Sequence, residues 1–288
     1  MRSYRWDGVV TALSSVAHGG EALGTVTYLR REKFLLPSGL VEEIPVVSGN
    51  AVRGLIRDAG AALMWERLGS PALPLPVMHA LWAGGALVKA KGEPLSGHRL
   101  ARLRRTVPHI GVFGAAGGGR IIDGALQVGK MLPVCQQTAH VLPESLSAGP
   151  LPDIWDLVQV ESYSRMPNAD RLPEVVQQQT PPVDGSEVAE SGSDGRMRYG
   201  VETFIAGTRF HWWMGLTNAT AAEKSFFDDV LARYSEHAVV GGRLARGHGQ
   251  LRLDVTERCL DGEPETAVWH DLGGASDAEV TEVLGWLN

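Results

Sequence analysis

Alternating apolar and polar positions predict a strand at the start of the chain. In YRWDGVVTALSSV (4–16) the alternation is regular enough for one face of a strand to be buried. The segment that follows, HGGEALG (18–24), is dominated by glycine and predicts a loop.

The clearest helical pattern in the sequence is EEIPVVSGNAVRGLIRDAGAALMWERLG (42–69). After an extended beginning, Ser48 or Asn50 can cap a helix, and Gly69 ends it. The apolar residues at helical spacing are Val52, Leu55, Ile56, Ala59 and Leu63.

Two arginines accompany this helix. Arg53 and Arg57 are one turn apart, so we expect them together beside the apolar stripe. A helix N-terminus attracts anions, and Ser48, Asn50 and Arg53 can hold a phosphate or a sugar there. An ordinary capped helix with solvated arginines explains the same pattern equally well.

The second half of the chain repeats this alternation of strand and helix. VETFIAGTRFHWWMGLT (201–217) has a two-residue period and predicts one strand, with Trp212 and Trp213 on opposite faces. One tryptophan is expected in the core, while the other can stack on a base or pack at an interface. A helix that starts at Asn218 or Thr220 follows, and QLRLDV (250–255) is the last strand.

These elements predict an α+β fold of the ferredoxin-like or RRM type, with an antiparallel sheet and helices on one face. Its core is assigned to residues 1–69 and 200–260, and 70–150 and 151–199 are expected to be insertions. Within the first insertion, the cluster Arg99, Arg102, Arg104 and Arg105 can be helical. Residues 164–198 are rich in Pro, Gln, Ser and Gly and predict an exposed excursion. Residues 261–288 are a separate acidic segment.

Composition is that of an ordinary globular protein, with 44% hydrophobic and 21% charged residues. No apolar run is long enough to span a bilayer, and we expect a cytoplasmic protein with no membrane partner. Cys135 and Cys259 are too few for a disulfide framework or a cysteine metal site, and no cofactor is expected.

The net charge of −6 argues against a nucleic-acid partner, because phosphate binding depends largely on Lys and Arg. Its distribution changes that conclusion. Seven acids and no Lys or Arg lie between Asp261 and the C-terminus, so subtracting them from −6 leaves +1 for residues 1–260. Local positive fields therefore matter more than the total, and we expect the acidic segment to face away from any polyanion.

The loop GGRLARGHGQL (241–251) is the strongest candidate for binding an anion. Glycines such as Gly242 let backbone N–H groups approach a phosphate, and Arg243 and Arg246 supply charge-assisted hydrogen bonds. The loop lacks the ending of a Walker A motif, and it precedes a strand, unlike a Rossmann fingerprint. A glycine-rich turn with solvated arginines is the alternative.

Catalytic signals are weaker. His18 and His248 both lie in glycine-rich segments and can meet, as the histidines of metal-free ribonucleases do, although such histidines are more often hydrogen-bonding or surface residues. Glu42 and Glu43 are expected to be solvated, so no metal site is predicted.

Four segments together resemble the CRISPR-associated RAMP superfamily. One segment of the family begins with Ile-Pro and continues with glycines and arginines, and residues 44–57, IPVVSGNAVRGLIR, are similar to it. A second, glycine-containing segment of the family is similar to residues 112–128, VFGAAGGGRIIDGALQV. IAGTRFHWWMGL (205–216) is similar to its Gly-Thr-x-Phe strand, and GGRLARGHGQL to its C-terminal glycine loop. The order of the four most resembles the backbone subunit that polymerises along guide RNA, with type IV systems nearest.

The resemblance implies an RRM-like palm, a helical or finger insertion at 70–150 and a thumb-like hairpin at 151–199. Arg53 and Arg57 then grip the guide backbone, and Arg165, Asn168 and Arg171 belong to the thumb. The implied partners are guide crRNA, target DNA or RNA that pairs with it, further copies of the chain and other effector subunits.

One departure from the family concerns cleavage. Type III backbone subunits that cut target RNA use an aspartate between the first strand and the first helix, whereas residues 14–57 contain no Asp. We therefore expect a binding subunit without nuclease activity. The alternative is a RAMP endoribonuclease that processes repeat RNA or cleaves target RNA, with His18 or His248 as the catalytic histidine for repeat processing.

Overall fold

A computed structural model describes residues 1–85, 96–117, 120–165 and 197–287. Its main sheet has the order β13-β1-β12-β8, with the short β9 also paired to β12. The bounds are β1 (Arg2–Ala12), β8 (Leu126–Val128), β9 (Leu132–Pro133), β12 (Arg209–Ala219) and β13 (Leu251–Cys259). All the pairings are antiparallel, and Trp6 of β1 lies opposite Met214 of β12 and Glu257 of β13.

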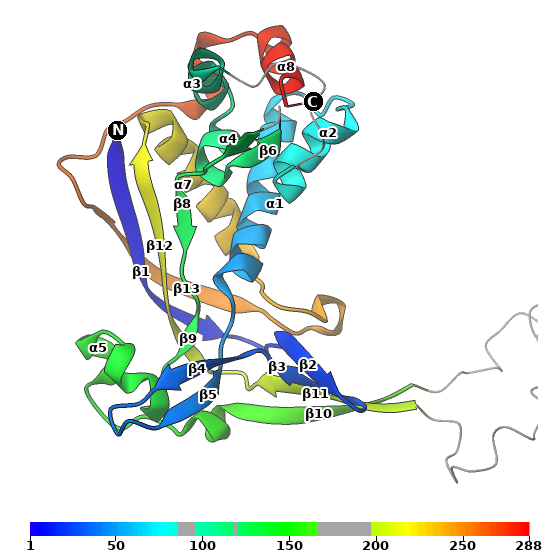
Figure 1. Cartoon of the computed structure of the whole chain (residues 1–288), viewed down its shortest axis with the longest axis vertical. Helices are drawn as coiled ribbons and strands as arrows, with labels where there is room; N and C mark the ends of the chain where they lie inside the picture. Colours follow the sequence, from blue (N-terminus) through cyan, green and yellow to red (C-terminus); the bar gives the residue numbers. More distant parts are fainter. Residues whose placement is uncertain (86–95, 118–119, 166–196, 288) are drawn as a thin grey trace, which may run out of the picture.

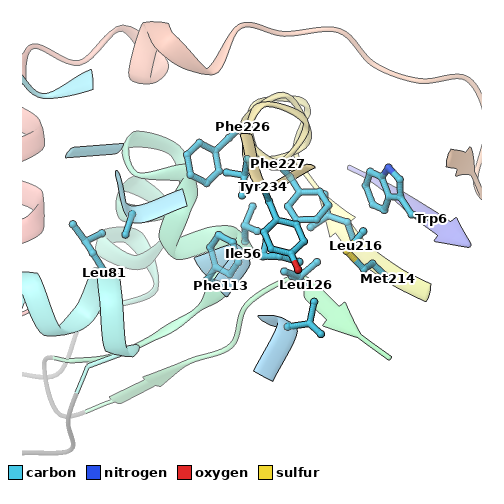
Figure 2. Packing of buried hydrophobic residues seen from close by; sticks show 14 of the residues in the cluster. Trp6, Ile56, Leu81, Phe113, Leu126, Met214, Leu216, Phe226, Phe227 and Tyr234 are labelled. Carbon is cyan, nitrogen blue, oxygen red and sulfur yellow. The ribbon is translucent and has the colours of Figure 1, made fainter. Parts of the chain in front are cut away.

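Two long helices, α1 (Gly49–Arg67) and α7 (Ala221–Glu236), pack beside each other against this sheet (Figure 1). Figure 2 shows Phe227 of α7 and Ile56 of α1 in one cluster with Met214 and Leu216 of β12, while Phe226 points to the other side of α7. All five side chains are fully buried. The predicted α+β fold with a ferredoxin-like palm is thus confirmed.

The local signals at the helix ends explain where both helices begin. Ser48 caps α1 by accepting a hydrogen bond from the Ala51 N–H, and α1 ends before Gly69, whose φ is +77°. Thr220 caps α7 in a capping box with Glu223. Ser48 and Thr220 are therefore the caps, and Asn50 and Asn218 are not.

A second sheet has the order β10-β11-β3-β2. Its strands are β2 (Gly19–Leu23), β3 (Val26–Leu29), β10 (Val158–Arg165) and β11 (Met197–Phe204). β10 and β11 are antiparallel and flank residues 166–196, so they form the two arms of the excursion predicted at 164–198. The expectation of a loop at 18–24 was wrong, because most of that segment is β2, an exposed edge strand whose pattern of burial carries no alternation.

The single strand predicted at 201–217 was also wrong. The chain turns between Phe204 and Arg209, with Gly207 at a φ of +89°, so β11 and β12 belong to different sheets. The apolar alternation continues through the turn because both strand ends bury residues in one core, where Phe204 and Phe210 meet edge to face with ring centroids 5.0 Å apart. Trp212 is the core tryptophan, and Trp213 packs against Arg5, whose guanidinium carbon lies 4.4 Å from the ring centroid.

Shorter elements complete the chain. They are β4 (Arg31–Leu35), β5 (Val41–Pro45), α2 (Leu75–Met78), η1 (His79–Ala83), α3 (Gly97–Thr106), α4 (Pro108–Phe113), β6 (Ala115–Gly117), β7 (Arg120–Ile122), η2 (Gln136–Val141), α5 (Glu144–Ser147), η3 (Ile154–Leu157), η5 (Leu244–Arg246), η6 (Trp269–Gly274) and α8 (Asp277–Gly285). The basic cluster at 99–105 is helical as predicted and forms α3. Among the described residues no helix is long and apolar enough to cross a membrane.

The acidic C-terminal segment folds onto the helical layer. Trp269 is buried against Phe226, and α8 buries Val280, Val283 and Leu284. Figure 1 shows α8 beside α3, at the opposite end of the molecule from β10 and β11. The division of the chain into palm, insertion, thumb and acidic segment remains a prediction.

Candidate nucleic-acid interface

The glycine loop at 241–249 lies directly against the segment that follows β1. Gly241 and Gly249 have φ of +82° and +81°, and a Cβ on either would lie within 2.3 Å of a backbone oxygen. The Gly242 N–H donates to the Ala17 carbonyl at 2.7 Å, and the Gly249 N–H to the Ser15 carbonyl at 2.8 Å. These amides fasten the loop to the protein, so the Gly242 amide is not free to hold a phosphate.

Arg243 has an unusual backbone conformation. Its φ is +61°, in the left-handed region that costs a non-glycine residue on the order of 1 kcal/mol. The conformation places its guanidinium carbon 5.3 Å from the ring centroid of Tyr199 and 5.8 Å from that of Tyr163. An arginine kept where glycine is favoured indicates that the position of its side chain matters.

Arg246 lies over the same two rings. Its guanidinium carbon is 5.0 Å from the Tyr163 centroid and 5.6 Å from that of Tyr199, and it donates a hydrogen bond to the Tyr199 hydroxyl. This bond lowers the pKa of Tyr199 below its ordinary value. Neither Arg243 nor Arg246 forms an ion pair with any described residue, in contrast to Arg233 and Arg252.

His248 holds the loop in place through two side-chain hydrogen bonds. The side chain is buried, with Nδ1 2.9 Å from the Ser15 hydroxyl and Nε2 2.6 Å from the Tyr163 hydroxyl. A neutral imidazole has one N–H, so it donates to one hydroxyl and accepts from the other. Tyr163 also donates to Glu161 at 2.7 Å, which ends the network in a carboxylate. His248 therefore fixes the loop to β10 through Nε2 and to the segment after β1 through Nδ1.

The N-terminus of α1 lies next to this loop through residues 15–18. The Ser48 N–H donates to His18 Nε2 at 3.2 Å, and burial lowers the pKa of His18. Ser48 is half-buried and Asn50 is exposed, so Asn50 is the freer of the two predicted ligands. The structure thus brings the loop and the helix N-terminus together, as the sequence predicted, while His18 and His248 have different hydrogen-bond partners.

Arg53 and Arg57 lie side by side, as predicted, but both point toward the end of α4. Each donates to the Phe113 carbonyl, at 2.7 Å and 2.8 Å, and burial lowers the pKa of both guanidinium groups. They line a cleft of about 490 Å³ together with Gly84, Gly114 and neighbouring residues. Both arginines therefore have a structural contact, whatever else they bind.

Three arginines of α3 have carboxylate or tryptophan partners within the protein. Arg104 makes two hydrogen bonds to Glu223, at 2.9 Å and 3.0 Å, and Arg102 lies 3.5 Å from Glu279. The guanidinium carbons of Arg99 and Arg102 lie 5.5 Å and 5.6 Å from the Trp286 ring centroid. The acidic segment does not simply face away from the basic residues, because its α8 neutralises part of α3.

Comparison with known proteins fits this geometry. No family model matches the chain, and a search of curated proteins also finds no match. Among solved structures, one described as "Type IV-B CRISPR Complex" shares 31% identity over 92% of this chain and 96% of its own, with a TM-score of 0.63. The chain belongs to the RAMP-like subunits of type IV CRISPR complexes. The resemblance to the CRISPR RAMP superfamily, with type IV nearest, is thereby confirmed.

The assignment of Arg165, Asn168 and Arg171 to a thumb remains a prediction. Arg165 is the last residue of β10, paired in register with Met197 of β11. Asn168 and Arg171 lie outside the described residues. The structure thus gives the two strands, β10 and β11, that flank residues 166–196.

Sequence reasoning missed the residues that support the loop of the CRISPR subunit. Tyr163 and Tyr199 are paired directly across β10 and β11, and their rings stack with centroids 5.5 Å apart and planes at 20°. Ser15 and Glu161 complete the network around His248. The available signal was one tyrosine on each side of the excursion, but nothing in the sequence fixes the strand register that makes them partners.

Proposed function

We propose that this chain is the backbone subunit of a CRISPR effector complex. It binds the sugar-phosphate backbone of guide crRNA and has no nuclease activity of its own. One observation carries the proposal. Arg243 and Arg246 lie over the Tyr163–Tyr199 pair of β10 and β11 with no carboxylate partner among the described residues. Phosphate binding requires such free guanidinium groups, because it depends on positive charge that the protein has not neutralised.

The RNA strand would run from the loop across the N-terminus of α1. Arg243 and Arg246 would hold phosphates, and Ser48 and Asn50 would contact the sugar or phosphate beside the helix N-terminus. Arg165, Asn168 and Arg171 of the thumb and the pair Arg53 and Arg57 belong to the same proposal. The protein would read shape and backbone while the bases stay free to pair with target DNA or RNA. Further copies of the chain and other effector subunits would extend the complex.

The geometry of the two histidines supports binding in preference to cleavage. Both ring nitrogens of His248 have partners, and Nε2 of His18 accepts the Ser48 N–H. A general acid or base needs a ring nitrogen within reach of the substrate. A nuclease that works through His248 would have to break the contacts that hold the loop, and one that works through Nε2 of His18 would have to break its bond to Ser48.

RNA binding and cleavage can be tested together. The purified chain is incubated with labelled repeat RNA and with unrelated RNA in EDTA, and binding and strand scission are both measured. We expect retention of both RNAs, protection from added nuclease and no cutting. Specific cutting that is lost in His18→Ala or His248→Ala would establish the ribonuclease alternative, and failure to retain any RNA would refute the proposal.

A further inference from the structure

The Tyr163–Tyr199 pair has a position that strand stability alone does not explain. The two rings belong to residues directly opposite in the β10–β11 register, and both side chains are half-buried. A cross-strand aromatic pair stabilises two strands by itself. Here, however, two guanidinium groups also lie within 5.8 Å of both ring centroids.

We propose that Tyr163 and Tyr199 form a stacking site for one unpaired nucleobase of the bound RNA. The proposal rests on the RNA-binding function above and assigns the base, whereas that function assigns the phosphates. Base and phosphate are one ribose apart within a nucleotide, so a phosphate held by Arg243 or Arg246 brings its base to these rings. Stacking on aromatic faces tolerates any base, which suits a protein that leaves sequence recognition to pairing.

The site is built in advance of binding. His248, which is 4% exposed, holds the Tyr163 hydroxyl from one side, and Glu161 holds it from the other. The Arg246 guanidinium holds the Tyr199 hydroxyl. Both rings therefore have fixed orientations, which reduces the entropy that a stacking base must offset.

The same sheet contains a second tyrosine with an arginine over its ring, Tyr28 with Arg31, which serves as a matched control. Along β3 and β11, which pair at Gly200 with Val26 and Val201 with Thr27, Tyr28 falls on the face opposite to Tyr199. Arg31 lies over Tyr28 at 5.5 Å, but it is bound to the buried carboxylate of Glu202 at 2.7 Å. Tyr28 is thus a tyrosine under an arginine whose charge is already neutralised.

The test uses a short unstructured oligoribonucleotide with 2-aminopurine at its centre, whose fluorescence falls on stacking. We expect quenching with the native chain and with Tyr199→Phe, which keeps the ring. Tyr199→Leu should abolish the quenching and raise Kd about 5- to 150-fold, the equivalent of about 1–3 kcal/mol. Tyr28→Leu should behave as the native chain.

The outcomes distinguish failure of the stacking site from failure of the proposed RNA binding. Native RNA affinity and quenching in both Tyr163→Leu and Tyr199→Leu would overturn the stacking site and leave RNA binding intact. Absence of RNA binding by the native chain would overturn both. If the leucine variants unfold, photocrosslinking of the native chain to RNA with 4-thiouridine decides, since an adduct on Tyr163 or Tyr199 supports the site and adducts found only elsewhere refute it.

Discussion

The molecule has two clusters of arginine that look alike in the sequence and differ in the structure. In α3, Arg104 is bound to Glu223, which is 1% exposed, and Arg102 lies beside Glu279. In the glycine loop, Arg243 and Arg246 face two tyrosine rings and have no ion pair with a described residue. The density of positive charge along the chain therefore does not tell which arginines are already paired within the fold.

The difference follows from what each cluster has to do. Glu223 takes part in the capping box of α7 and also accepts two hydrogen bonds from Arg104. The Arg104–Glu223 ion pair therefore joins α3 to α7, which are distant in the sequence. Arg243 instead adopts a left-handed backbone conformation and makes no ion pair with any residue that the structure describes. Charge in α3 thus serves the fold, and we propose that charge in the loop serves a ligand.

The largest effect is expected from reversing the charge of the loop. In Arg243→Glu/Arg246→Glu, two charge-assisted contacts worth about 1.5–3 kcal/mol each are lost, so Kd for single-stranded RNA should rise at least about 100-fold. The slope of log K against log salt should fall by about 1.4, since each phosphate contact on a single strand contributes about 0.7. Both are measured by fluorescence anisotropy over a salt series. Unchanged binding would remove the basis for separating the two clusters.

In α3 we expect a substitution to lower the stability of the protein and to leave RNA affinity unchanged. Arg104→Leu leaves the buried carboxylate of Glu223 without its cation, which should lower the free energy of unfolding by about 3 kcal/mol. Urea unfolding measures it, and RNA affinity should stay the same. Arg105→Leu is the control, because Arg105 is exposed on the same helix and should change stability by less than about 0.5 kcal/mol. Equal effects of the two substitutions would contradict a structural role for the Arg104 pair.

The contrast between the clusters also shows what the sequence can predict. The helices α1 and α7 and their caps at Ser48 and Thr220 depend on neighbouring residues, and the sequence predicted both helices and limited each cap to two candidates. The pairing of Arg104 with Glu223 joins residues 119 positions apart, and no local pattern reports it. The same limit explains the missed Tyr163–Tyr199 pair.

The failures within the fold have a similar cause. β2 was read as a loop because its five residues are all exposed, so burial leaves no period to detect. The turn between β11 and β12 was missed because Phe204 and Phe210 are buried in the same core although they belong to different sheets. The loop at 241–249 was found because its composition, which needs no register, is unusual.

A moderate effect is expected at His109, which is buried in α4 near Arg57. Its burial, followed by the nearby Arg57 charge, lowers the pKa to about 3, and neither ring nitrogen has a hydrogen-bond partner in the described structure. The unfolded chain takes up a proton near pH 6.5, so it binds more protons than the folded chain at pH 5. The free energy of unfolding should therefore fall by about 2 kcal/mol from pH 7 to pH 5 because of this residue. His109→Leu should lose correspondingly less over that range, measured by urea unfolding at both values, and an identical loss would rule out His109 as the cause.

The smallest effect is expected from Arg102→Glu, although it removes as much positive charge as one loop substitution. Arg102 is 40% exposed, its charge faces Glu279, and α3 lies far from the β10–β11 arms (Figure 1). Reversal there acts on RNA only through a screened field, because the Debye length is about 8 Å at physiological ionic strength. Kd should stay within about two-fold of the native value at 150 mM salt, whereas Arg246→Glu should raise it about ten-fold or more. Equal losses in the two variants would mean that RNA responds to total charge, and free guanidinium groups would no longer mark the site.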